Sequence, residues 1–487
     1  MTSTILWFRR DLRLADNPAL TAALGRGQVI PLYIHAPEEA APWQPGAASH
    51  WWLHHSLAAL QDSLRRLGSR LILRSGSSAE ILRALARETG SDAVLWNRLY
   101  EPPLVERDKA IKARLRAEGI DCRSSNGSLW HEPWEVTTQG GTPFKVFSPF
   151  WRAVQARGTP TAPLPAPAAM PAVPTRLSSL SLRELGLLPR VPWDQGLAAT
   201  WRPGEPSTLQ ALARFLEQAI RDYAGHRDFP AVEGTSRLSP GLHFGELGPS
   251  QVYWAVLQAD EGQARAGGGA EAFLRQLGWR QFATHLLFHF PATVDQPLDP
   301  RFRSFPWAGA EDRQAMRAWQ RGETGIPIVD AGMRELWTTG WMHNRVRMIV
   351  ASLLTKNLLV PWQEGARWFW DTLVDADLAN NTLGWQWVAG CGADAAPYFR
   401  VFNPVLQSRK FDPDGHYLRR WVPELRELPD RWVHAPWEAP TTVLARAGVR
   451  LGSDYPFPLV DLAQSRRRAL AAWDEIKGRR AVAPDEI

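Results

Sequence analysis

Short apolar runs alternate with helical patterns over the first 130 residues of the chain. The apolar runs are typical of buried strands and comprise residues 5–8, 29–34, 71–73 and 93–96. Helical spacing of apolar residues covers three intervening segments, residues 51–67, 79–88 and 104–118. Because alternating strands and helices form parallel sheets covered on both faces, residues 1–130 are predicted to be an α/β domain. No Gly-x-Gly-x-x-Gly follows the first run, so a standard dinucleotide-binding fingerprint is absent.

The pattern changes after residue 130. Residues 159–174 are dense in Pro and Ala and lack periodicity, which predicts an extended connector over the surface. From about residue 206 nearly every segment has helical spacing, namely residues 209–223, 249–259, 270–290, 315–321, 328–338, 343–358 and 362–373. Gly267, Gly268 and Gly269 predict a loop between two of these helices. The sequence thus predicts three parts: an α/β domain (1–130), a long linker (131–205) and an all-helical domain (206–487).

The composition of the 487-residue chain is that of a soluble globular protein, with 45% hydrophobic and 22% charged residues. It contains no run of eighteen apolar residues, and its first residues lack the apolar core of a signal peptide. Its two cysteines, Cys122 and Cys391, argue against a disulfide framework or a zinc cluster. We therefore expect a cytoplasmic protein without a membrane span.

The net charge of +6 is compatible with a polyanionic partner. The chain also contains 25 tryptophans, and most of them are expected to fill the core. An indole beside an arginine is nevertheless the arrangement that binds an unstacked base.

A turn at residues 234–240 carries hydroxyl groups and backbone N–H groups, and a helix is expected to begin near Pro249. Such a loop can hold a phosphate, to which Arg237 adds positive charge. A helix-capping loop is the alternative, and these residues alone favour it.

Gln276, Trp279 and Arg280 lie at i, i+3 and i+4 and are expected on one face of a helix. An indole between an amide and a guanidinium can stack on a base and donate hydrogen bonds to its edge. A tryptophan buried between two helices would show the same spacing, and both interpretations stay open.

The richest segment lies between Trp341 and Pro404. Asn344, Arg347 and Met348 share a face of an expected helix there, and Asp375 and Asp377 are natural partners for its arginines. Two neighbouring carboxylates can also carry out acid–base chemistry or bind a metal. No set of His and Cys at ligand spacing accompanies them, so no metal is expected. No nucleophile motif stands out either.

These motifs together resemble the photolyase/cryptochrome family from end to end, most closely its bacterial members that split cyclobutane pyrimidine dimers in DNA. The resemblance rests on residues 7–13, 227–239, 325–330, 341–348 and 385–404. It implies an α/β antenna domain, a linker and an all-helical domain that binds FAD bent into a U.

The resemblance also implies site residues. Asp375 would pair with Arg347, and Asn381 would face N5 of the flavin. The implied FAD-binding residues are Tyr223, Thr235, Ser236, Arg237, Leu238, Ser239, Arg347, Asp375, Ala376, Asp377 and Asn381. The implied DNA-binding residues are Arg227, Gln276, Trp279, Arg280, Asn344, Arg345, Met348, Trp387, Arg400 and Gln407.

Three tryptophans, Trp385, Trp362 and Trp307, resemble the family's chain of indoles that carries an electron from the surface to the flavin. Together with Asn381 and Gln276 they are the implied catalytic residues. The implied activity is that of a deoxyribodipyrimidine photo-lyase, a carbon–carbon lyase that repairs DNA by light-driven electron transfer from reduced FAD.

Dimer-splitting relatives usually carry Glu where this chain has Gln276, which predicts slower or less efficient repair. Gln is also found in relatives that act on (6-4) photoproducts, but those carry a histidine pair where this chain has Asn344 and Met348. The alternatives are a (6-4) photolyase, a cryptochrome-type photoreceptor, and a non-catalytic nucleic-acid binder.

An antenna pigment, folate or deazaflavin, stays open, because the Asn-Glu pair of some folate-binding relatives is missing at Pro103 and Leu104. Phe144, Phe147 and Trp151 are expected at the domain interface rather than against a pigment. We expect a monomer that binds damaged DNA, and no membrane association.

Overall fold

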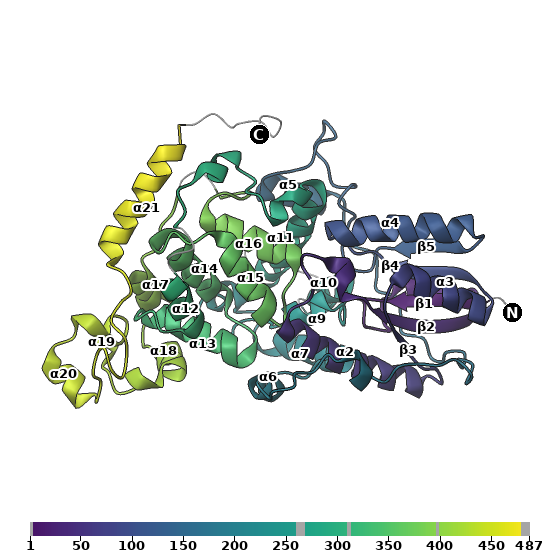
Figure 1. Ribbon diagram of the computed structural model, residues 1–487, viewed down its shortest axis with the longest axis horizontal. Helices are drawn as coiled ribbons and strands as arrows, with labels where there is room; N and C mark the ends of the chain where they lie inside the picture. The colour runs from purple at the N-terminus through teal and green to yellow at the C-terminus, as the bar shows by residue number, and fades with distance from the viewer. Residues whose placement is uncertain (1–2, 260–267, 309–312, 396–398, 479–487) are drawn as a thin grey trace.

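The computed structural model describes residues 3–259, 268–308, 313–395 and 399–478. An α/β domain forms one end of the molecule and a larger helical domain the other (Figure 1). Long helices of the helical domain, α11 (Gly269–His289), α15 (Trp362–Thr372) and α16 (Leu378–Ala389), run through its middle. Within the described residues no helix is long and apolar enough to cross a membrane.

The N-terminal domain is built on a parallel five-stranded sheet with strand order β3-β2-β1-β4-β5. Its strands are β1 (Ser3–Phe8), β2 (Gln28–His35), β3 (Ile72–Ser75), β4 (Ser91–Asn97) and β5 (Asp121–Ser125). Alternate residues of β1 enter different cores: Leu6 and Phe8 pack on one face, and Ile5 and Trp7 on the other. Burial on both faces explains the continuous apolar runs.

The helices of this domain and of the linker are α1 (Pro18–Leu24), α2 (Ala47–Arg66), α3 (Ser78–Thr89), α4 (Pro102–Ala117), α5 (Phe147–Ala156) and α6 (Gln195–Thr200). The four predicted strands and three predicted helices are present. The sequence analysis missed β5, which is polar and has only Cys122 fully buried, and the short helix α1.

The connector at residues 159–174 contains neither helix nor strand, as predicted. It is nevertheless held to the α/β domain, since Asp16 and Leu164 exchange hydrogen bonds and the Met170 N–H donates to the Leu67 carbonyl. The boundaries at residues 130 and 205 stay predictions.

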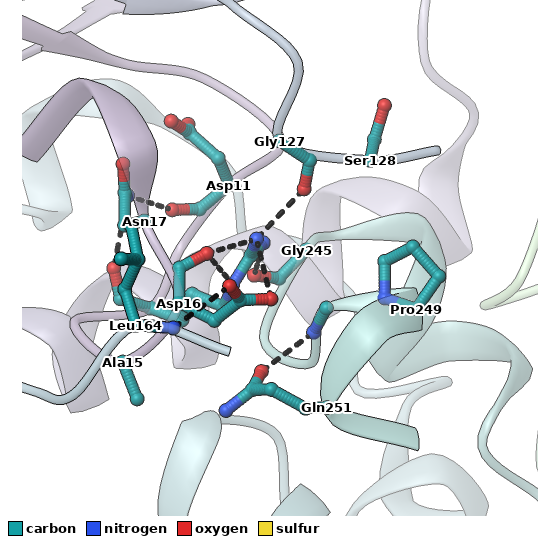
Figure 2. Close-up of polar contacts among 12 residues, drawn as sticks. Asp11, Ala15, Asp16, Asn17, Gly127, Ser128, Leu164, Gly245, Pro249 and Gln251 are labelled. Atoms are coloured by element: carbon teal, nitrogen blue, oxygen red, sulfur yellow. Dashed lines mark hydrogen bonds and ion pairs between the residues drawn. The ribbon is translucent and has the colours of Figure 1, made fainter. Parts of the chain in front are cut away.

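A buried arginine, Arg13, joins the two domains, and its acceptors Asp16, Gly127 and Gly245 are labelled in Figure 2. The Arg13 guanidinium donates to the carbonyls of Asp16 and Gly127 in the N-terminal half, and to the carbonyl of Gly245 in the helical domain. Arg13 is 1% exposed, and burial lowers its pKa from the ordinary value. Because a buried charge needs full hydrogen bonding, this network favours one relative position of the domains.

The remaining helices belong to the helical domain. They are α7 (Glu205–Gln218), α8 (Tyr223–His226), α9 (Ser239–His243), α10 (Pro249–Ala259), α11, α12 (Arg313–Arg321), α13 (Pro327–Thr339), α14 (Asn344–Ser352), α15, α16, α17 (Pro404–Phe411), α18 (His416–Trp421), α19 (Asp430–Val433), α20 (Thr441–Arg446) and α21 (Leu462–Ile476). A π-helical turn, Leu353–Asn357, follows α14. Short 3-10 helices are Pro37–Ala40, Arg183–Leu185, Pro291–Val294, Pro300–Ser304, Pro423–Leu425 and Pro436–Glu438.

The predicted helices are present, with several differences. The helix predicted at residues 209–223 ends at Gln218 as α7, and Tyr223 begins a separate helix, α8. The helix expected to begin near Pro249 does begin there, as α10, but a short helix that was not predicted, α9, lies between it and the 234–240 turn and begins at Ser239. The segment that forms α16 was not predicted to be helical. Of the glycine loop expected at residues 267–269, Gly267 lies outside the described residues, Gly268 caps α11, and Gly269 is already the first residue of that helix, contrary to the prediction.

Candidate functional site

One cavity of about 640 Å³ opens into the helical domain between α11, α14, α15 and α16. This volume lies within the range of about 300–1,000 Å³ typical of ligand pockets. Most of the predicted site residues line it, namely Arg227, Gln276, Trp279, Asn344, Arg345, Arg347, Met348, Asp375, Ala376, Asp377, Asn381, Trp385, Trp387 and Arg400. Residues far apart in the sequence therefore share one wall, which spacing alone could not establish.

An ion pair lies at the wall of the cavity. Arg347 Nη2 donates to both carboxylate oxygens of Asp375, at 2.9 and 3.1 Å, and Arg347 Nε donates to the Met342 carbonyl. The Ser239 hydroxyl donates to Asp375 at 2.6 Å, which joins α9 to the same carboxylate. The expected pairing is present, and it leaves the guanidinium at a fixed place beside the cavity.

Asp377 is the N-cap of α16, where its Oδ1 accepts hydrogen bonds from the backbone N–H and the side-chain amide of Asn380. His243 Nδ1 lies 3.4 Å from its other oxygen. Burial by itself raises the pKa of Asp377, but the His243 contact and the Arg280 charge outweigh it and hold the pKa below its usual range. A permanently charged carboxylate therefore stands at the positive end of α16.

Asn381 is oriented by its own hydrogen bond. Its side-chain Nδ2 donates to the Ala366 carbonyl of α15 at 3.0 Å. This bond uses one of the two amide N–H groups and fixes the orientation of the side chain, which contributes to the lining of the cavity.

The residues predicted to hold phosphates lie beside this cavity. Ser239 and Tyr223 contact its lining directly, since the Ser239 hydroxyl donates to Asp375 and the Tyr223 carbonyl accepts from the Arg227 N–H. Tyr223 packs against Phe215 and Phe273, and Leu238 is buried in the same cluster, so only its backbone is available to a ligand. Arg237 lies over the Trp341 ring at 4.8 Å. Thr235 and Ser236 belong to the turn before α9 and are absent from the cavity lining among the described residues.

The three residues predicted to share one face of α11 do not all point to the cavity. Gln276 and Trp279 line the cavity, and the Trp279 ring stacks on Phe147 at 3.8 Å with an angle of 8°. Arg280 instead turns inward, where it donates to the carbonyls of Ser128 and Leu242. Its geometry supports a role beside Asp377 and at the domain contact, and gives no support to the predicted contact with DNA.

Two further predicted DNA residues differ in position. Arg400 is exposed and lines the cavity. Gln407 lies on α17, outside the lining residues, in the part of the chain that the structure describes.

The three predicted relay tryptophans differ in burial and in their relation to the cavity. Trp385 lines it and is 3% exposed, Trp362 is 1% exposed at the start of α15, and Trp307 is half-buried. A hydrogen bond from the Ala308 N–H to the Leu359 carbonyl joins the Trp307 segment to the residues just before Trp362. Of the three, Trp385 lines the cavity and Trp307 is the most exposed.

The sequence analysis missed His243, Asn380 and Trp319. His243 lies one turn after Ser239 on the short helix α9, so the i, i+4 spacing was the available signal. Trp319 is fully buried, 6.2 Å from the Trp385 ring, and no sequence signal separates it from an ordinary core residue.

Comparisons with known proteins place the chain in a family. It matches the family described as DNA photolyase over residues 4–169 and the FAD binding domain of DNA photolyase over residues 273–475. It is 49% identical over 477 residues to a deoxyribodipyrimidine photo-lyase of Agrobacterium fabrum, covering 97% of this chain and 98% of that protein. The chain belongs to the photolyase/cryptochrome family.

Other members of this family are similar over almost the whole chain. Cryptochrome-2 of Arabidopsis thaliana is 42% identical, with 99% of this chain and 81% of that protein covered. The crystal structure of a bacterial class III photolyase from Agrobacterium tumefaciens superposes with a TM-score of 0.94 at 48% identity, covering 98% of each chain. The α/β domain followed by a helical FAD-binding domain is thus confirmed.

Proposed function

We propose that this protein is a light-dependent DNA repair enzyme, a deoxyribodipyrimidine photo-lyase that splits cyclobutane pyrimidine dimers. The main observation behind this proposal is that one cavity is lined by two groups of residues, one suited to a cofactor and one suited to a DNA base. We assign Arg347, Asp375 and Asn381 of the cavity lining to an inner, cofactor-binding wall, and Gln276, Trp279, Met348 and Trp387 to an outer, DNA-binding wall. The photo-lyase name of the Agrobacterium relative supports the same function.

The residues of the inner wall fit FAD. The cavity is large enough for a ring system, and it is lined by a fixed guanidinium, charged carboxylates and an oriented amide. Arg347, Asp375, Asp377 and Asn381 would hold the flavin, with Ser239 and the turn at residues 235–238 beside them for the phosphates and sugar. When bound, FAD supplies light-driven electron donation to the dimer. Trp385, Trp362 and Trp307 are proposed to conduct an electron inward from the surface. Trp385 lines the cavity, Trp362 lies on α15, which Trp385 contacts at Gly365, and Trp307 is the most exposed of the three.

The residues of the outer wall would receive the dimer outside the duplex. The stack on Phe147 fixes the orientation of the Trp279 ring. An extruded pyrimidine dimer can therefore stack on the indole without first ordering it. Gln276 would donate a hydrogen bond to the dimer. Arg345, Arg227 and Arg400 would bind phosphates, with affinity that falls as salt rises.

A cryptochrome-type photoreceptor is the second candidate, and it is favoured by the 42% identity to the Arabidopsis protein. The residues Trp279, Met348 and Trp387, which line the outer wall, favour repair over signalling alone. A (6-4) photoproduct is the less favoured lesion, because Asn344 and Met348 stand where a histidine pair would be needed.

Two smaller cavities are candidate sites for an antenna pigment. The cavity lined by Pro103 and Leu104 measures only about 140 Å³, below the usual range for ligand pockets. A cavity of about 370 Å³ is lined by Trp130, Trp151 and Tyr253. We propose the second cavity for a folate or deazaflavin, which would give Trp151 a role beyond the interface expected from sequence. Phe147 and Phe144 pack in the cluster around Phe150 and Phe282.

The proposed setting is a monomer in the bacterial cytoplasm, associated with the nucleoid when bound to damaged DNA. The test of the cofactor is direct: purified protein should be yellow or blue and should keep its flavin absorbance through desalting. A colourless protein that takes up no added FAD would contradict the proposal.

A further inference from the structure

An acidic residue lies on the face where DNA phosphates are proposed to bind. Asp228 is about one-third exposed, and its carboxylate lies 2.9 Å from Arg345 Nη2. Arg345 lines the large cavity and is 19% exposed at its side chain. A carboxylate in such a place repels phosphates and weakens DNA binding, so we expect a contribution of Asp228 that offsets this cost.

Arg345 is held from several sides at once. Its guanidinium carbon lies 4.3 Å above the ring of Phe411, and its Nη1 points at the sulfur of Met348, 3.9 Å away. Its backbone N–H donates to His343 Nδ1, the N-cap of α14. Among the described contacts, Asp228 is the charged partner of this guanidinium, so its loss would remove the strongest of the contacts that fix the Arg345 rotamer.

We propose that Asp228 is a positioning residue that determines specificity: it fixes the Arg345 guanidinium toward the cavity and so favours DNA that carries a dimer over undamaged DNA. This inference rests on the proposed function. The carboxylate weakens binding to any phosphate backbone, and it strengthens binding only where a lesion enters the cavity and meets the fixed guanidinium. Removing the charge should therefore lower the affinity for DNA with a dimer without lowering the affinity for undamaged DNA.

The experiment measures dark binding of the full-length, flavin-loaded protein to two otherwise identical oligonucleotides, one with a single cyclobutane dimer. Asp228→Asn is compared with Glu233→Gln, which removes the same charge from an exposed position five residues further along the same segment. Asp228→Glu serves as the conservative rescue. Asp228→Asn is also made in an Arg345→Gln background to test whether the acid acts through that arginine.

We expect Asp228→Asn to lower the ratio of dimer to undamaged affinity on the order of three- to ten-fold, with undamaged binding unchanged or tighter. Glu233→Gln should leave the ratio unchanged, Asp228→Glu should restore most of it, and Asp228→Asn should add nothing in the Arg345→Gln background. A parallel loss of both affinities would show a merely structural role and overturn the inference. A gain in dimer affinity would also overturn it, because Asp228 would then compete with phosphate for Arg345. Wild-type protein that binds both oligonucleotides equally would contradict the proposed substrate as well, whereas discrimination kept by Asp228→Asn would overturn this inference alone.

Discussion

The indole of Trp385 lies directly against the backbone of α15 at Gly365. A Cβ atom on Gly365 would stand 2.1 Å from Cη2 of Trp385 and 2.7 Å from Cδ2 of Leu354, far inside normal contact. Trp362 lies one turn earlier on the same helix. The missing side chain at position 365 therefore sets how closely Trp385 approaches α15 and Trp362.

Gly365→Ala should displace Trp385 and slow light-driven reduction of the flavin. Overpacking of this kind costs about 1–3 kcal/mol, so the unfolding temperature should fall by a few degrees. Transient absorption and thermal melts measure the two effects. Gly225→Ala is the matched control, because a Cβ there meets nothing within 4 Å. A Gly365→Ala protein with normal photoreduction would show that the contact does not set the rate.

Trp362→Phe should slow photoreduction of the flavin while leaving repair by chemically prereduced enzyme intact. Phenylalanine fills most of the buried site but is much harder to oxidise than indole, so only the relay is affected. Photoreduction is followed under a steady blue lamp with an external reductant. Unchanged photoreduction would remove Trp362 from the path and direct attention to Trp319, which also lies beside Trp385.

The strands of the α/β domain were predictable because they are buried on both faces and appear as apolar runs. β5 was not, since only Cys122 of its five residues is fully buried and the rest are polar. The helix α16 was hidden for another reason. It packs against α11, α14 and α15, so its apolar residues occupy several faces and give no single stripe.

Some features of the site were also predictable from the sequence, and others were not. The need of Asp375 for a cationic partner was visible in the sequence, and its ion pair with Arg347 is present. The spacing of Gln276 and Arg280 on one helical face was also visible, but it did not predict that the Arg280 guanidinium points away from the cavity. That side chain is long, and the carbonyls of Ser128 and Leu242 that it reaches come from distant segments. Only tertiary packing brings those carbonyls together.

Gln276→Glu should raise the yield of dimer repair per absorbed photon. Gln276 lines the cavity, and its amide Nε2 donates to the Ala272 carbonyl of its own helix at 3.2 Å. A protonated carboxyl group at this position would donate a hydrogen bond to the dimer more strongly and could supply a proton. The measurement is repair quantum yield with prereduced enzyme, with Gln276→Ala as the control for loss of the side chain. Equal yields for Gln and Glu would mean that another residue compensates.

Folding stability should decrease as the pH falls from about 6.5 toward 4. Burial lowers the pKa of His285 to about 4 and that of His343 to about 4, whereas both residues in the unfolded chain titrate near 6.5. Between these values the unfolded state binds more protons, so each histidine contributes a slope of about 1.4 kcal/mol per pH unit that favours unfolding in acid. Denaturant titrations at several pH values measure it. His285→Gln should flatten the slope, and an unchanged slope would contradict the assignment to His285.

The central claim is that the cavity places a flavin beside an extruded pyrimidine dimer, and light-dependent repair tests it most directly. Prereduced protein is mixed with an oligonucleotide that carries one cyclobutane dimer, and the restored strand is quantified after blue light and in a dark control. We predict that the dimer disappears only in the light, with many turnovers per protein. Dimer left intact in the light by a flavin-loaded, reduced and DNA-bound protein would contradict the account.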